Sequence, residues 1–124
     1  MINTLNIGAY VFDKLSTKIP TIKTYPIVAD NDAKYPFIVY KRIGLSSLMC
    51  KDGNYEDEAT VEVTVIAEKY AISVNIAQQV REALEDNYDT FDGMEIETTL
   101  QSGTEDFSDN VYTQKLIYRI KTNN

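Results

Sequence analysis

The chain has 124 residues, of which 44% are hydrophobic and 25% charged, and its formal net charge is −7. This length suits one domain with one core, and the composition is that of an ordinary soluble globular protein. No apolar run approaches the roughly 20 residues that span a bilayer, and the N-terminus lacks the features of a signal peptide. We therefore expect a single domain over residues 1–124 with no membrane segment. Cys50 is the only cysteine, which excludes an internal disulfide and fits a cytosolic origin.

A first helix is predicted for residues 4–16, with Asn3 or Thr4 as its cap. Its expected apolar stripe consists of Leu5, Ala9, Phe12 and Leu15. Residues 21–28 have the pattern of a short strand. Pro26 cannot donate a ladder hydrogen bond, so this strand is expected at an edge of the sheet.

A longer strand is predicted for residues 37–43. Its first four residues are apolar on both faces, which is usual for a strand covered on both sides. The sequence KDGN at residues 51–54 is a strong turn signal. It predicts a long antiparallel hairpin with the next strand, in which residues 46–57 form the extended tip.

The centre of the predicted fold is a strand followed at once by a helix, within residues 58–86. The strand has polar and apolar positions in strict alternation: Thr60, Glu62 and Thr64 against Val61, Val63 and Val65. The helix has an apolar residue at every fourth position, with two alanines beside them: Ile72, Ile76, Val80 and Leu84, with Ala77 and Ala83. We expect this stripe to pack on the valine face of the strand.

The last third of the chain is predicted to contain two strands. Residues 87–93 are expected to form a loop that stops at Gly93, and residues 94–101 alternate as a strand does. Residues 102–104 then lead into an acidic loop before a final strand at residues 111–120. The order of elements indicates an α+β fold: one mainly antiparallel sheet of four to five strands with two helices packed on one face.

The sequence contains no recognisable catalytic constellation. It has no histidine, the commonest general base and metal ligand, and so Cys50 has no histidine partner that would make it a thiolate. Asp52, Glu56, Asp57 and Glu58 are close together but do not have the spacing of a calcium loop. We expect a protein that is not an enzyme, with no catalytic, cofactor-binding or metal-binding residues.

Acidic residues are concentrated in one stretch. Residues 82–114 contain ten acids and no lysine or arginine, whereas residues 1–81 contain nine acids and nine bases. A solvated face that aids solubility explains such a stretch. The alternative is a surface that repels another polyanion, because binding to nucleic acid depends on lysine and arginine at the phosphates.

Three stretches of the chain form a pattern together. They are the N-terminal helix that leads to an extended segment, the run YPFIVY at residues 35–40, and TVEVTVIA at residues 60–67 followed by AQQVREAL at residues 77–84. In these stretches the chain resembles the tail-completion, or tail-terminator-like, proteins of long-tailed bacteriophages and prophages. The resemblance covers most of the chain, and its motifs describe a fold, not a reaction.

The resemblance implies a structural function. Members of that family assemble as rings, usually sixfold, at the head-proximal end of the tail, where they end the tail tube and join it to the head connector. For this chain the resemblance implies a hexameric ring in the virion tail, with tail-tube and head-connector proteins as partners and no cofactor. DNA would pass through the ring without specific binding. Carboxylates that keep phosphates moving would line its channel, and the candidates are Asp86, Asp89, Asp92, Glu95, Glu97, Glu105, Asp106 and Asp109.

Two surfaces are candidate contacts between subunits. Thr60, Glu62 and Thr64 face away from the predicted helices and are neither fully charged nor fully apolar, as expected of a patch covered on assembly. Leu48, Met49 and Tyr55 lie at the predicted hairpin tip and could contact a neighbouring subunit or the tube. A second interpretation stays open, in which the chain is a small acidic adaptor that binds a protein partner as a monomer or dimer.

Overall fold

The computed structural model describes residues 4–49, 55–85 and 87–123. Asn3, Cys50, the predicted turn at residues 51–54, and Asp86 lie outside the described residues. The elements are a 3₁₀ turn Thr4–Asn6, α1 Ile7–Lys18, β1 Lys23–Pro26, β2 Phe37–Met49, β3 Tyr55–Ala67, α2 Tyr70–Leu84, β4 Asn87–Phe91, β5 Met94–Ser108 and β6 Val111–Asn123.

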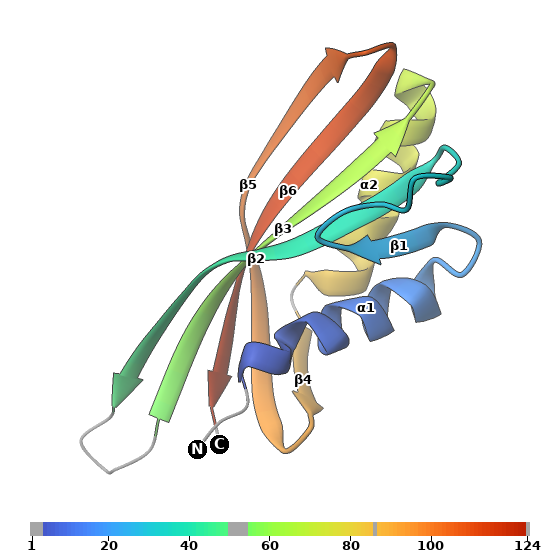
Figure 1. Cartoon of the computed structure of the whole chain (residues 1–124). Coiled ribbons are helices and arrows are strands. Elements are labelled where there is room, and N and C mark those ends of the chain that lie inside the picture. Colours follow the sequence, from blue (N-terminus) through green and yellow to red (C-terminus); the bar gives the residue numbers. More distant parts are fainter. Residues whose placement is uncertain (1–3, 50–54, 86, 124) are drawn as a thin grey trace.

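The strands form one twisted sheet in the order β1-β2-β3-β6-β5-β4 (Figure 1). β1 lies at an edge, as predicted, and runs parallel to β2, whereas every other pair of neighbours is antiparallel. The α+β class, the two helices and the long hairpin of β2 and β3 are confirmed. The predicted number of strands was too low, because the described residues form six.

Two predicted loops are wrong, because each is a two-residue hairpin turn between longer strands. Residues 87–91 form β4, and Asp92 and Gly93 follow with φ of 52° and 78°. β5 likewise continues to Ser108, and Asp109 and Asn110 turn with φ of 53° and 65°. Two successive residues with positive φ match the twist of paired strands, and Asp, Asn and Gly adopt this conformation most readily.

The core lies between the two helices and one face of the sheet. Val61, Val63 and Val65 are buried in a single cluster with Ile76 and Val80, so the predicted packing of the helix on the valine face is confirmed. α2 packs on β3 and β6, α1 packs on β1 and β2, and the two helices contact each other. Neither helix among the described residues is long and apolar enough to cross a membrane.

The predicted helix stripes are each partly wrong. In α1 the buried residues are Ile7, Tyr10, Val11 and Leu15, whereas Leu5, Ala9 and Phe12 are exposed. Leu5 lies before the α-helix begins, and the buried face follows the spacing of Ile7, Val11 and Leu15. In α2 Ser73 is buried in place of Ile72, because the Ser73 hydroxyl donates to the Tyr70 carbonyl at 2.7 Å and is thereby satisfied.

Truncation of Ile76 tests this packing. Ile76 is 3% exposed, so Ile76→Ala should lower the free energy of unfolding by about 2–5 kcal/mol through lost burial and a residual cavity. Ile72→Ala is the matched control, since Ile72 is 41% exposed and should cost about 1 kcal/mol or less. Urea denaturation followed by circular dichroism measures both. Equal losses in the two variants would contradict the observed orientation of α2.

Candidate functional site

The sheet face opposite the helices, here called the outer face, is polar, and its charged side chains pair with one another. Thr60, Glu62 and Thr64 are half-buried on this face. Glu62 forms an ion pair with Lys115 at 3.7 Å, and Glu58 forms one with Arg119 at 3.0 Å. The predicted patch therefore exists as one surface, and its burial in an assembly stays a prediction.

A strained turn at the end of β1 displays two apolar side chains. Ile27 and Val28 are 71% and 72% exposed. Ile27 has a φ of 66°, and the Val28 N–H donates to the Pro26 carbonyl at 2.6 Å, which makes a γ-turn. A β-branched residue rarely adopts this conformation, and such strain is concentrated at functional positions. This turn is not among the elements predicted from the sequence, in which its signal is an apolar pair directly after a strand proline.

Aromatic rings extend this apolar surface along the outer face. Phe37 stacks on Tyr35 at a centroid distance of 5.4 Å and meets the edge of Tyr25 at 5.9 Å. A hollow of about 440 Å³ separates Ile27 and Val28 from the outer face of β3 and β6. Exposed apolar patches beside a polar surface are typical of protein–protein contacts.

Two long hairpin arms, β2–β3 and β5–β6, extend from opposite ends of the sheet (Figure 1). In the β2–β3 arm Leu48 is 63% exposed and lies opposite Glu56. Met49 and Tyr55 lie opposite each other there, while the placement of their side chains lies outside the description. In the β5–β6 arm residues 101–110 are all exposed, including Phe107.

The candidate channel residues fall into two groups at opposite ends of β5. Asp89, Asp92, Glu95 and Glu97 lie at the β4–β5 turn end, whereas Glu105, Asp106 and Asp109 lie in the β5–β6 arm. A strand rises about 3.3 Å per residue, so Glu95 and Glu105 lie roughly 30 Å apart along β5. The acidic stretch is therefore not one patch on a single subunit, and the channel role of its members stays a prediction.

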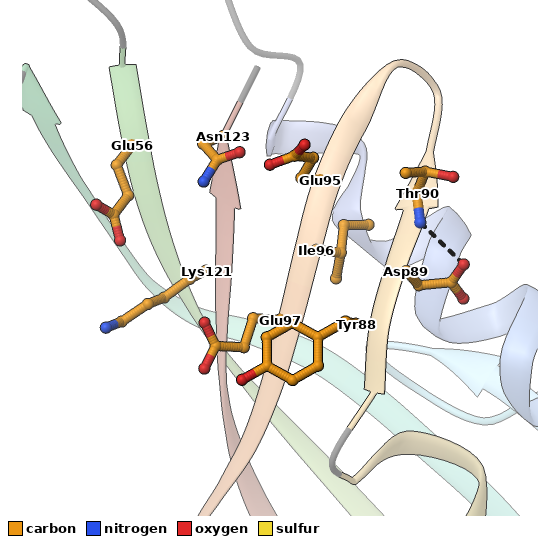
Figure 2. Close-up of a pocket in the computed structure, with 9 residues that line it drawn as sticks. All are labelled: Glu56, Tyr88, Asp89, Thr90, Glu95, Ile96, Glu97, Lys121 and Asn123. Carbon is orange, nitrogen blue, oxygen red and sulfur yellow. Dashed lines mark hydrogen bonds between the residues drawn. The ribbon is translucent and has the colours of Figure 1, made fainter. Parts of the chain in front are cut away.

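The first group borders an open pocket of about 540 Å³ on the outer face (Figure 2). Glu56, Glu95 and Glu97 contribute carboxylates, and Lys121 lies directly opposite Glu97 in the register of β5 and β6. Figure 2 shows the Asp89 carboxylate apart from these, near the Thr90 N–H that donates to it at 2.9 Å. Among the described residues no group of three or more acids or cysteines is placed to hold a metal ion.

Asp89 instead anchors β4 to α1. Its carboxylate forms an ion pair with Lys14 at 2.5 Å, and the Tyr10 hydroxyl lies 3.5 Å away. The hydrogen bond from Lys14, with that from the Thr90 N–H, lowers the pKa of Asp89. Burial, with the nearby charge of Asp89, raises the pKa of Tyr10 to about 12. This contact holds the edge strand to the helix layer.

Tyr118 makes a similar contact between β6 and the end of α2. Its ring is fully buried, and its hydroxyl lies 3.5 Å from the Glu85 carboxylate, which Arg81 also holds at 2.6 Å. Burial, followed by the charge of Glu85, raises the pKa of Tyr118. Both tyrosines are core residues whose rings are buried while their hydroxyls make polar contacts at the rim of the core.

Comparison with solved structures finds the same fold in a chain of the virion of native gene transfer agent (GTA) particle. The TM-score is 0.76 with 12% sequence identity, and the match covers 92% of both chains. This chain shares its fold with a virion protein. The likeness to a virion structural protein that the sequence suggested is therefore confirmed at the level of the fold.

A second solved structure, which has no functional name, has a TM-score of 0.56 and 14% identity, and the match covers 97% of this chain and 96% of that one. No family model matches the sequence, and no curated protein matches it.

The Lys14–Asp89 pair predicts a pH-dependent stability. Because the folded pKa of Asp89 is lowered, its contribution is present above the ordinary aspartate pKa and is lost as pH falls through the lowered value. Asp89→Asn should lower the free energy of unfolding by about 0.2–1 kcal/mol at pH 7, and this difference should shrink as pH falls below the ordinary aspartate pKa of about 3.9. Asp13→Asn, at an exposed acid on the same helix, is the control. Equal stability of wild type and Asp89→Asn at pH 7 would contradict the role of the pair.

Proposed function

We propose that this chain is a non-enzymatic structural protein of a phage or prophage virion. It forms rings at the head-proximal end of the tail, where it ends the tail tube and joins it to the head connector. The observation that carries the proposal is the fold shared with a virion chain over 92% of both chains. The sequence resemblance to tail-completion proteins supports the finer role.

The distribution of polar and apolar surface supports assembly of this chain with other subunits. The outer face carries paired charges, as in the contacts of Glu62 and Glu58 with β6. Some apolar side chains are exposed to solvent in the monomer. They are Ile27 and Val28 beside β1 and Leu48 in one arm. Surfaces of this kind, with apolar anchors beside a polar rim, suit contacts between subunits.

The acidic residues support passage of DNA through such a ring. Glu95 and Glu97 at one end of β5, and Asp109 at the other, place carboxylates along the length of the subunit. On the outer face the cations of β6 have acidic partners, with Lys115 beside Glu62 and Arg119 beside Glu58. A channel lined in this way repels phosphates and offers few cations to hold them.

Oligomer size tests the ring directly. Size-exclusion chromatography with light scattering, with and without the tail-tube protein as template, should give a mass close to six times 14.1 kDa. Deletion of residues 48–54 should leave a folded monomer that no longer assembles, because Leu48 is exposed and lies outside the core. A wild-type protein that stays a monomer or dimer with the template present would favour the adaptor instead.

Charge reversal tests the channel. Particles carrying Glu95→Lys with Glu97→Lys should retain more DNA after ejection is triggered, and the retained fraction should fall as salt rises, because the new cations hold phosphates. Asp30→Lys with Asp32→Lys changes the net charge equally at an exposed turn outside β5 and is the control. Unchanged DNA retention in the first variant would show that Glu95 and Glu97 do not line the channel.

A further inference from the structure

At each edge of the sheet a short strand pairs with only part of the longer strand beside it. β1 pairs with residues 37–40 of β2, and β4 pairs with residues 94–98 of β5. Among the described residues no further strand pairs with the remaining edge at residues 41–49, the β2 free segment, or at residues 99–108, the β5 free segment. Such edges present unpaired N–H and C=O groups that can pair with another chain.

The two free segments suit each other in direction and length. β2, β3, β6 and β5 are successively antiparallel, so β2 and β5 run in opposite directions on opposite sides of the sheet. Two copies placed side by side in one orientation therefore bring β5 of one copy antiparallel to β2 of the next. β1 ends opposite Tyr40 and β4 begins opposite Thr98, each beside the first residue of a free segment, so the pairing of neither strand overlaps this contact.

Opposite charges lie at matching positions of the free segments. The β2 free segment begins with Lys41 and Arg42, and the β5 free segment carries Glu105 and Asp106. Contacts between two β2 edges or two β5 edges would therefore carry charges of one sign. A contact of β2 with β5 brings opposite signs together, which favours a head-to-tail arrangement of copies.

The faces of these residues agree as well. Lys41 lies on the outer face opposite Glu62, and Arg42 lies on the helix side opposite the buried Val61. On β5, Asp106 lies opposite Thr113 on the outer face, and Glu105 lies opposite Gln114 on the helix side. Directly opposite residues in a sheet share a face, so one antiparallel register can match Lys41 with Asp106 and Arg42 with Glu105.

Glu105 is already oriented for such a partner. Its carboxylate accepts a hydrogen bond from the Tyr70 hydroxyl at 2.9 Å and another from Gln114 Nε2 at 2.9 Å. Both donors are neutral, and the carboxylate forms no ion pair with the described residues. A guanidinium from a neighbouring copy would supply the missing cation.

The irregularities of the two strands also match. The register shifts once in β2 between Arg42 and Gly44, and once in β5 between Leu100 and Ser102. In this contact the β2 shift comes first and the β5 shift follows after Ser46, so the two shifts cancel beyond both of them. Between the two shifts Ser46 lies opposite Ser102, and both residues are on the outer face.

We propose that neighbouring copies join through main-chain hydrogen bonds between the β2 free segment of one copy and the β5 free segment of the next. Lys41 lies opposite Asp106, and Arg42 lies opposite Glu105. The inference rests on the proposed function, because the occupant of each edge is a second copy in a ring. Lys41 is level with Ser102 across its own sheet and lies opposite Asp106 in the contact, so neighbouring copies are offset by four residues (106 − 102) along the strands. This offset supplies the stagger that a closed ring of strands requires.

A disulfide test reads the register directly. In a Cys50→Ala background, Ser46→Cys combined with Ser102→Cys should give a ladder of covalent oligomers after mild oxidation, seen on a non-reducing denaturing gel. The two positions lie on opposite sides of the sheet in one chain, so the bond forms only between copies. Each single cysteine variant, and Ser46→Cys with Ser108→Cys, should give at least about tenfold less product above the dimer.

A charge-swap test gives an independent readout. Lys41→Glu with Arg42→Glu in one chain, and Glu105→Lys with Asp106→Lys in another, should each remain monomeric by light scattering. An equal mixture should assemble, because each reversed edge then meets its opposite. Thermal unfolding by circular dichroism checks that both variants fold.

The outcomes separate the two levels of the proposal. Wild-type oligomers without a cysteine ladder and without rescue in the mixture overturn the edge contact and leave the ring standing. A wild-type protein that forms no oligomer with the tail-tube protein present overturns both.

Discussion

The packing of α2 on the valine face of β3 is the constraint on which the rest of the structure depends. β3 lies at the centre of the sheet between β2 and β6, so burial of Val61, Val63 and Val65 fixes which face of every other strand points inward. A one-residue slip would turn the valines outward and Glu62 inward, at a cost of several kcal/mol for each misplaced side chain. The polar outer face is thus a consequence of where the helices lie.

The same constraint leaves the edges and the arms available. The strands are 13 to 15 residues long, and the two helices leave much of the β2–β3 and β5–β6 arms exposed, although Tyr70 of α2 contacts Glu105 and Tyr112 in the second arm. A monomer gains little from these extensions, because they bury few apolar side chains. Their length is explained more simply by contacts with other subunits, in which an arm or an edge becomes covered.

Sequence periodicity predicted the elements whose patterns are local. The alternation at residues 60–65 predicted β3, and the apolar residues at every fourth position from Ile76 predicted α2. The last strand, β6, was also predicted. The Asp-Gly pair at residues 92–93 predicts the end of a loop, and β4 was therefore not predicted. In the structure both residues have positive φ and make a hairpin turn. Two features depend on contacts between residues distant in the sequence, which a local pattern does not contain. They are the burial of Ser73 in place of Ile72 and the parallel pairing of β1 with β2.

The acidic stretch shows the same limit for the candidate site. Ten acids without a base in residues 82–114 suggest one negative surface, yet the sheet divides them. β6 lies between β3 and β5, so Lys115, Arg119 and Lys121 lie among the acids of both neighbours on the outer face. Charge that is segregated along the chain is therefore partly neutralised in space. Carboxylates still outnumber cations at the β4–β5 end, where Glu56, Glu95 and Glu97 border one pocket with Lys121, and repulsion of a passing polyanion would act there.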